Sequence, residues 1–164
     1  MIDRYKLLSR HNPILKKVQT ESPLTLGNGE FAFTADITGL QTFSEHYEDE
    51  VPLCTMSQWA WHSFSNNGLK REDLKLEIYK NKDREIGFAS REKGQEDLFN
   101  YLRENPHKFH LGQIGLDLRM DDASPVDIES IKDIRQELDL WEGSIYSQFT
   151  VQGIDVRNDR LYIK

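Results

Sequence analysis

The sequence predicts an all-β fold, an antiparallel β-sandwich with one short helix. Several segments alternate apolar and polar residues with a period of two, which is typical of strands. Turn-forming residues separate these segments, and only one segment has apolar residues at a clear helical spacing. Many short strands between turns favour a sandwich. A chain of 164 residues is most simply one domain, so we expect a single domain over residues 1–164.

The predicted strands follow from the alternation. In the first of them, Phe31, Phe33, Ala35 and Ile37 lie on one side and the intervening residues on the other. Trp141–Ser144 has the composition of a tight turn and joins the fourth and fifth predicted strands into a hairpin. The strands are Glu30–Ile37, Leu74–Tyr79, Phe109–Met120, Ile134–Leu140 and Ile145–Val151, with further strand at 154–156 and 161–163.

Helix is expected at Glu96–Glu104. Leu98, Phe99 and Leu102 recur there at helical spacing, and Asn105-Pro106 ends the segment because the residue before a proline avoids the helical conformation. A helical turn is expected within 127–132. The remaining stretches, 45–52, 65–73, 81–94 and 121–130, are predicted loops.

Composition and charge exclude several classes of function. The net charge of −7 and the lack of a basic stripe argue against a nucleic-acid partner. Cys54 is the only cysteine, so no intrachain disulfide can form. We see no apolar run of membrane-spanning length and no apolar core of a signal peptide, so we expect no membrane partner and a cytoplasmic location. The five histidines have no metal-ligand spacing, and we expect neither a metal nor a cofactor.

The segment Ser57–Phe64 has the side chains of a sugar-binding surface. Trp59 and Trp61 are two residues apart, so in a strand they share one face. Aromatic rings stack on the apolar faces of sugars, and Gln58 and His62 offer hydrogen-bonding groups beside them. Packing in the core is an equally good explanation of two tryptophans, and His62 alone is more often structural. The sequence leaves both interpretations open.

The run before this segment contains turn residues and two carboxylates. Gly27-Asn28-Gly29 favours an ordinary hairpin turn over a loop that approaches a ligand. Glu30 and Asp36 are six residues apart, roughly 20 Å along a strand, whereas the catalytic carboxylates of glycosidases are about 5–9.5 Å apart. They are therefore not a catalytic pair. We expect Asp36 to order the turn at Thr38-Gly39.

Several of these stretches resemble the start of the bacterial six-hairpin glycosidases, which are related to the maltose and trehalose phosphorylase family. The most specific are RHNP at 10–13, SPLTLGNGEFAFTADITGLQTF at 22–43 and SQWAWHSF at 57–64. YLRENPHKFHLG at 101–112 and QELDLWEG at 136–143 extend the likeness over nearly the whole chain. Ala60 is a departure, since glycine is expected between the two tryptophans.

The resemblance implies an N-terminal antiparallel, supersandwich-like β-sandwich, followed in such proteins by a longer (α/α)₆ barrel with the catalytic carboxylates. This chain resembles only the first part, so we expect no catalytic residue in it. Its expected partners are a carbohydrate and the downstream catalytic domain. Gln58, Trp59, Trp61 and His62 are candidate substrate contacts, and the candidate domain-contact or turn residues are Asn28, Glu30, Asp36 and Gln41. Two alternatives stay open, a stand-alone carbohydrate-binding module and a structural protein-interaction domain.

Overall fold

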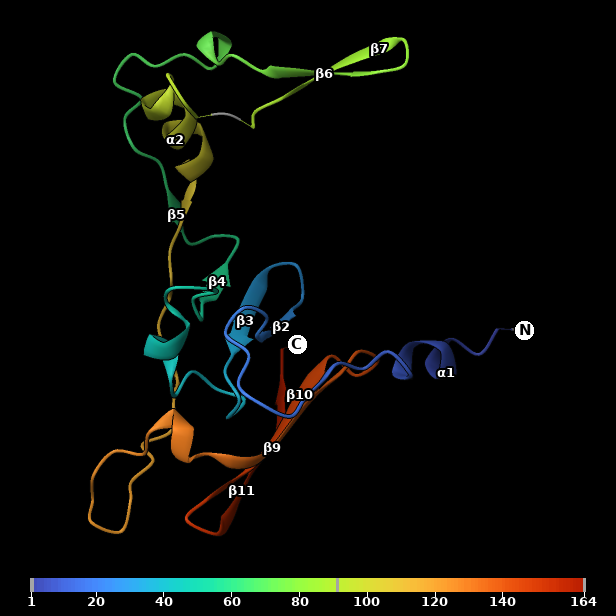
Figure 1. Ribbon diagram of the computed structural model, residues 1–164, viewed down its shortest axis with the longest axis vertical. Coiled ribbons are helices and arrows are strands. Elements are labelled where there is room, and N and C mark those ends of the chain that lie inside the picture. The colour runs from blue at the N-terminus through green and yellow to red at the C-terminus, as the bar shows by residue number, and fades with distance from the viewer. Residues whose placement is uncertain (1, 91, 164) are drawn as a thin grey trace. The chain divides into compact units, whose positions relative to one another are not determined.

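A computed structural model describes residues 2–90 and 92–163 of the chain (Figure 1). Antiparallel strands in several sheets dominate it, and the predicted all-β fold with a short helix is confirmed. The chain forms two compact units, a sandwich unit of Met1–Trp59 with His110–Lys164 and a small unit of Ala60–Phe109. The expectation of a single domain over residues 1–164 stays a prediction.

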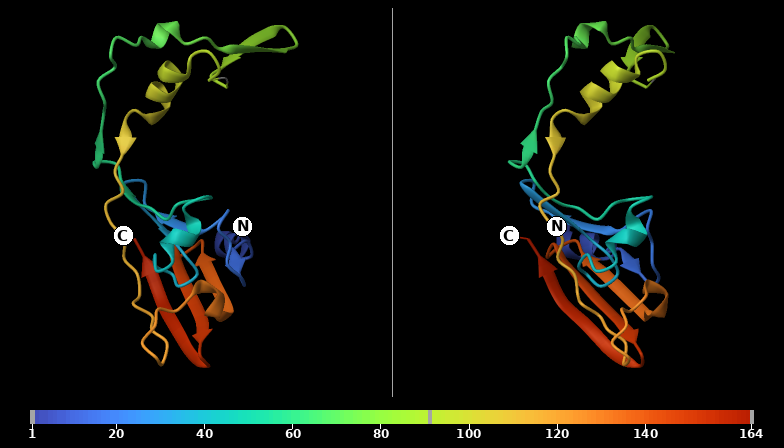
Figure 2. Two further views of the ribbon diagram at one scale, coloured as in Figure 1. Left: turned by 60° about the vertical axis from the view of Figure 1, so that its left-hand side comes forward. Right: turned by 90° about the vertical axis from the view of Figure 1, so that its left-hand side faces the viewer.

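Two antiparallel sheets make up the sandwich unit. The first has four strands in the order β1-β9-β10-β11, and β9 and β10 form the predicted hairpin (Figure 2). The second has three strands in the order β2-β3-β4. The strands are β1 (Ile14–Leu15), β2 (Leu24–Gly27), β3 (Phe31–Ala35), β4 (Thr55–Ser57), β9 (Lys132–Asp139), β10 (Ser144–Val151) and β11 (Ile154–Tyr162).

The core of the sandwich unit has two clusters. In one, Leu26 and Phe33 of the three-stranded sheet pack with Ile145 of the four-stranded sheet, which joins the two sheets face to face. In the other, residues outside the strands, such as Ile37 and Tyr47, cluster with Phe149 of β10. The period-two alternation explains both clusters, because every second residue of β3 and β10 points inward. This confirms the sandwich-like, all-β architecture.

Short helices lie around the sheets of the sandwich unit. A two-turn α-helix precedes β1, and single 3₁₀ turns lie between β3 and β4 and before β9. The last of these turns falls within the stretch where a helical turn is expected. They are α1 (Arg4–Ser9), η1 (Ser44–Tyr47) and η3 (Ile128–Ser130).

The small unit has two antiparallel pairs of strands and the predicted helix. β5 pairs with β8, and β6 pairs with β7. Helix α2 (Glu96–Glu104) has the predicted bounds, and its Leu98 is buried. The other elements are β5 (Trp61–His62), η2 (Arg71–Asp73), β6 (Glu77–Asn81), β7 (Arg84–Phe88) and β8 (His107–Lys108).

Two predictions of local structure are wrong, and one helix was not predicted. The loop predicted at 81–94 contains β7, and α1 is not anticipated by the sequence. The strand predicted at Phe109–Met120 is mostly irregular, because its backbone bonds go to scattered partners rather than to one neighbouring strand. The carbonyl of Ile114 accepts a bond from the N–H of Gln41 (2.8 Å), for example, while the N–H of Leu116 bonds the Thr42 hydroxyl (3.0 Å).

The described residues include no helix with the length and apolar character needed to cross a membrane.

Candidate functional site

Asn28 lies in the turn that joins β2 to β3. Its side-chain Oδ1 accepts hydrogen bonds from the backbone N–H groups of Glu30 (3.0 Å) and Phe31 (2.9 Å). Gly29 has a φ of +89°, a conformation that glycine adopts without steric cost. This is the hairpin geometry that the sequence favours. Asn28 and Glu30 are exposed at the tip of the hairpin.

Replacing Asn28 by alanine removes both of these hydrogen bonds. Because the turn is exposed, water satisfies the freed N–H groups, and we expect a loss of only about 1 kcal/mol in the free energy of unfolding. Urea denaturation measures this value. Asn28→Asp keeps the accepting oxygen and should cost less than half as much. Equal losses in the two variants would show that the side-chain acceptor does not stabilise the turn.

Asp36 is buried at the end of β3, with 1% of its surface exposed. Its Oδ1 accepts from the backbone N–H (2.7 Å) and hydroxyl (2.5 Å) of Thr38, and its Oδ2 accepts from the N–H of Phe43 (2.7 Å). Burial raises the pKa of the Asp36 carboxyl, and the hydrogen bonds from Thr38 and Phe43 partly oppose this. The carboxyl therefore orders a buried turn and is closed to a substrate.

Gln41 is also buried and makes structural contacts. Its Nε2 donates to the carbonyl of Thr34 (3.0 Å), and its Oε1 accepts from the hydroxyl of Thr55 (3.3 Å). These bonds tie the segment after β3 to β3 itself and to β4. The side chains of Asp36 and Gln41 are thus enclosed by the sandwich unit, where they cannot reach another domain.

The segment after β4 exposes Gln58 and Trp59. β4 ends at Ser57, and a bend follows it. Trp59 has 70% of its surface exposed, and the backbone N–H of Gln58 bonds the carbonyl of Glu30 (2.8 Å). The ring of Trp59 is therefore not part of the core of the sandwich unit.

Trp61 and His62 form β5 in the small unit. Trp61 has 52% of its surface exposed, whereas His62 is half-buried. The His62 ring stacks on Phe109, with ring centroids 4.5 Å apart, and meets His107 and Phe64 edge-on at 5.0 and 4.6 Å. Its Nδ1 is buried and has no hydrogen-bond partner within the described residues. His62 thus belongs to an aromatic cluster of its own unit.

The eight candidate residues are divided between the two units, with Trp61 and His62 in the small unit and the other six in the sandwich unit. The continuous strand that would place Trp59 and Trp61 on one face is broken between β4 and β5, and the two tryptophans belong to different units. Sequence reasoning missed the cross-strand partner of His62, which is His107. No sequence signal predicts this pairing, because the two residues are 45 positions apart and their strands have two residues each.

Metal or thiol chemistry has no support in the described part of the chain. No group of three or more His, Cys, Asp or Glu side chains there could hold a metal ion. Burial raises the pKa of the Cys54 thiol, which favours the protonated, unreactive form.

We compared the chain with protein-family models, with curated proteins and with solved structures, and none of them matched. The resemblance to six-hairpin glycosidases therefore stays an expectation from the sequence stretches at 10–13, 22–43, 57–64, 101–112 and 136–143. The geometry adds that, among the candidate substrate contacts, Gln58, Trp59 and Trp61 are open to a ligand and His62 is largely enclosed.

Proposed function

We propose that this chain is the non-catalytic N-terminal domain of a glycoside hydrolase. It packs on the catalytic barrel of that enzyme and contributes aromatic side chains to the rim of a carbohydrate site. The chemistry, cleavage of a glycosidic bond with acid assistance, is performed by carboxylates outside these 164 residues.

The exposure of Trp59 and Trp61 is the observation that carries this proposal. A large aromatic ring that stays in water forgoes roughly 25 cal/mol of stabilisation for each Å² of apolar surface that burial would have removed from water. Their exposed fractions of 70% and 52% disfavour the alternative of core packing. Rings that a fold leaves open are suited to stack on a sugar or to pack against another domain.

The positions of Glu30 and Asp36, the two carboxylates in the stretch 22–43, support a non-catalytic role for the chain. A catalytic carboxyl must exchange a proton with the substrate or attack it, which requires access. Asp36 is buried and its oxygens accept three hydrogen bonds. Glu30 precedes the other end of β3, a strand of five residues that spans roughly 17 Å. The two groups cannot act on one glycosidic bond.

Binding of glycans by the 164-residue chain tests the proposal. We expect oligosaccharide binding on a glycan array, weakened about tenfold, or ~1.4 kcal/mol, by Trp59→Ala or Trp61→Ala. Trp141→Ala is the matched control, since Trp141 is also exposed but lies in the β9–β10 turn. Its effect should be below twofold. Circular dichroism establishes that each variant is folded.

Two results would contradict the proposal. Hydrolysis or phosphorolysis of a glycoside by the purified chain would show that it has catalytic residues of its own. Absence of glycan binding in every condition, with the fold intact, would favour a domain whose tryptophans contact only protein.

A further inference from the structure

One end of the sandwich unit is basic and apolar. Residues 3–17 contain five basic side chains and one acidic one, in a chain whose net charge is −7. None of the residues of α1 is buried. The ring of Tyr5 meets Trp141 of the β9–β10 turn edge-on, with centroids 5.6 Å apart, and both rings are about half-exposed. The basic residues, all exposed, are Arg4, Lys6, Arg10, Lys16 and Lys17. We call this surface the basic end.

Helix α1 has little to stabilise it within one molecule. A helix of six residues is too short to be stable in water by itself, and helices in proteins are stabilised chiefly by burying an apolar face. Here Tyr5, Leu7 and Leu8 all stay exposed. The segment that follows is firmly held, because the Asn12 side chain donates to Glu137 (3.3 Å) and accepts from the N–H of Leu140 (3.1 Å). The basic end is thus held in place but uncovered.

The other end of the sandwich unit is acidic. Residues 44–50 and 117–133 contain ten carboxylates against Arg119 and Lys132, and all ten are exposed. Three of them, Glu48, Asp49 and Glu50, follow η1 directly. We call this surface the acidic end.

A hollow of about 270 Å³ lies in the acidic end. Phe43, Leu116 and Val126 are among its apolar lining residues, and Glu45 and Asp117 are its carboxylates. A hollow that is lined by apolar and polar residues in similar measure, two of them carboxylates, matches a helix that combines exposed apolar and basic side chains.

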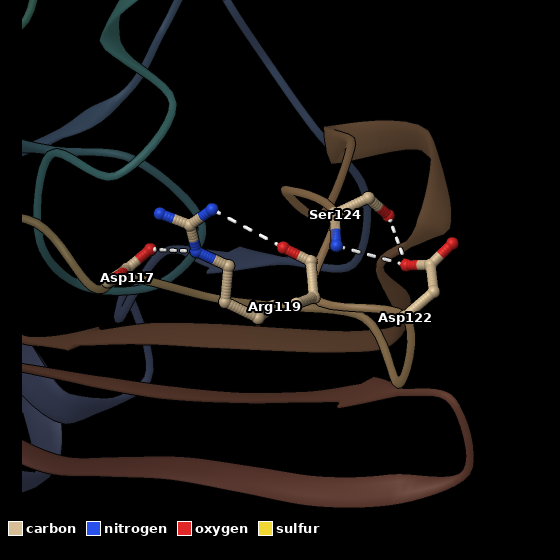
Figure 3. Close-up of polar contacts among 5 residues, drawn as sticks. Asp117, Arg119, Asp122 and Ser124 are labelled. Atoms are coloured by element: carbon tan, nitrogen blue, oxygen red, sulfur yellow. Dashed lines mark hydrogen bonds and ion pairs between the residues drawn. The ribbon is translucent and has the colours of Figure 1, made fainter.

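The loop beside this hollow is held by its own hydrogen bonds (Figure 3). The Nε of Arg119 donates to Oδ1 of Asp117 at 2.6 Å, and the N–H and hydroxyl of Ser124 donate to Oδ1 of Asp122 at 3.0 and 2.6 Å. The bonds from Ser124 hold the pKa of the Asp122 carboxyl below its ordinary value. Of the carboxylates that line the hollow, Asp117 is thus held by an ion pair with Arg119.

The two ends cannot meet within one molecule. η3 lies directly before β9, and Trp141 lies just after it. The eight residues of β9 span roughly 26 Å. Figure 1 shows α1 and the loop 117–124 beyond opposite ends of this strand.

We propose that the chain associates head to tail, with the basic end of one copy seated in the acidic hollow of a second copy. The apolar side chains of α1 enter the hollow, and Arg4, Lys6 and Arg10 face the carboxylates around it. A contact between two different surfaces leaves one of each free, so it yields rings or open chains rather than a closed dimer. A six-residue helix buries little area, so the association is weak and depends on salt.

Sedimentation velocity of the 164-residue chain tests this inference. In about 20 mM NaCl, the weight-average mass should rise above the monomer mass of 19.2 kDa as the protein concentration increases from about 20 to 500 µM. In about 1 M NaCl, where the screening length is about 3 Å, it should stay at the monomer value. The triple variant Arg4→Glu, Lys6→Glu, Arg10→Glu should be monomeric in both buffers.

Charge exchange separates this contact from general electrostatics. Glu48→Lys, Asp49→Lys, Glu50→Lys should also abolish association, and mixing it with the first triple variant should restore a complex of two different chains. The matched control is Lys70→Glu, Arg71→Glu, Lys75→Glu, which changes the net charge of the small unit as much as the first variant changes that of the sandwich unit. Association in the mixture of the two triple variants would show that the basic end of one chain contacts the acidic end of the other.

Three outcomes would overturn the inference: a monomer at every concentration in low salt, association that survives reversal of the basic end, or a mixture of the two variants that stays monomeric. If the control variant with the charge reversals in the small unit lost association to the same extent, net charge rather than this contact would govern association.

Discussion

Asp36→Ala is expected to lower the free energy of unfolding by about 3 kcal/mol, and the melting temperature by roughly 10 °C. The substitution removes the acceptor of three hydrogen bonds in a position with 1% exposure. The N–H groups of Thr38 and Phe43 then lose their side-chain acceptor where water cannot easily replace it. Leaving a buried donor unpaired costs about 1–3 kcal/mol. The substitution also removes the free-energy cost of burying the carboxylate, which offsets part of this loss of stability.

Asp127→Ala is the matched control for this prediction. Asp127 also accepts a bond from a backbone N–H, that of Glu129 (3.2 Å), but its side chain is exposed. The free energy of unfolding that Asp127→Ala loses should therefore be several-fold smaller when both variants are measured by guanidinium denaturation. Equal effects of the two substitutions would show that burial of the Asp36 turn adds nothing to stability.

The pH dependence of the Asp36 effect has a defined sign. Burial raises the pKa of this carboxyl in the folded protein. The folded state therefore holds the proton more tightly than the unfolded state, in which the pKa is about 3.9. The stability that Asp36 contributes is complete below that value and declines as the pH rises through the folded-state pKa. The difference between the parent chain and Asp36→Ala should be larger at about pH 4 than at about pH 7.

Local patterns predicted the elements whose signals lie within a few residues. The alternation Phe31, Phe33, Ala35 fixed both the position and the inward face of β3, and Leu98 with Asn105-Pro106 fixed the bounds of α2. Turn chemistry also explained the geometry at Asn28 and Asp36. These features depend on backbone preferences of neighbouring residues, which a sequence expresses directly.

Pairing between distant segments could not be predicted. β7 lies in a stretch rich in charged residues, and its strand character comes from pairing with β6 rather than from its composition. The 109–120 stretch has the right alternation, but its hydrogen bonds go to several different neighbours. Likewise, spacing alone could not decide whether Trp59 and Trp61 are buried, because two tryptophans at i and i+2 suit a core and a ligand surface equally well.

Gly39→Ala is expected to cost about 3 kcal/mol in the free energy of unfolding. Gly39 has a φ of +79°, and a Cβ placed there would lie 2.7 Å from Oγ of Ser147 and 2.9 Å from Nδ2 of Asn158. Both atoms are engaged, since Gln136 donates to the Ser147 hydroxyl (2.9 Å) and Asn158 donates to the carbonyl of Thr38 (3.3 Å). A methyl group must displace them, which weakens the bond from β11 to this turn and the bond between β9 and β10.

Gly29→Ala isolates the contribution of crowding. Gly29 also has a positive φ, +89°, but a Cβ there would have no described atom within 4 Å. Gly29→Ala should lower the free energy of unfolding only by the conformational penalty of a left-handed alanine, about 1 kcal/mol. Thermal unfolding of the two variants side by side measures the difference, about 2 kcal/mol, which is the cost of separating the turn from the four-stranded sheet. Equal losses would mean that the turn tolerates a methyl group and that its contact with Ser147 and Asn158 is not tightly packed.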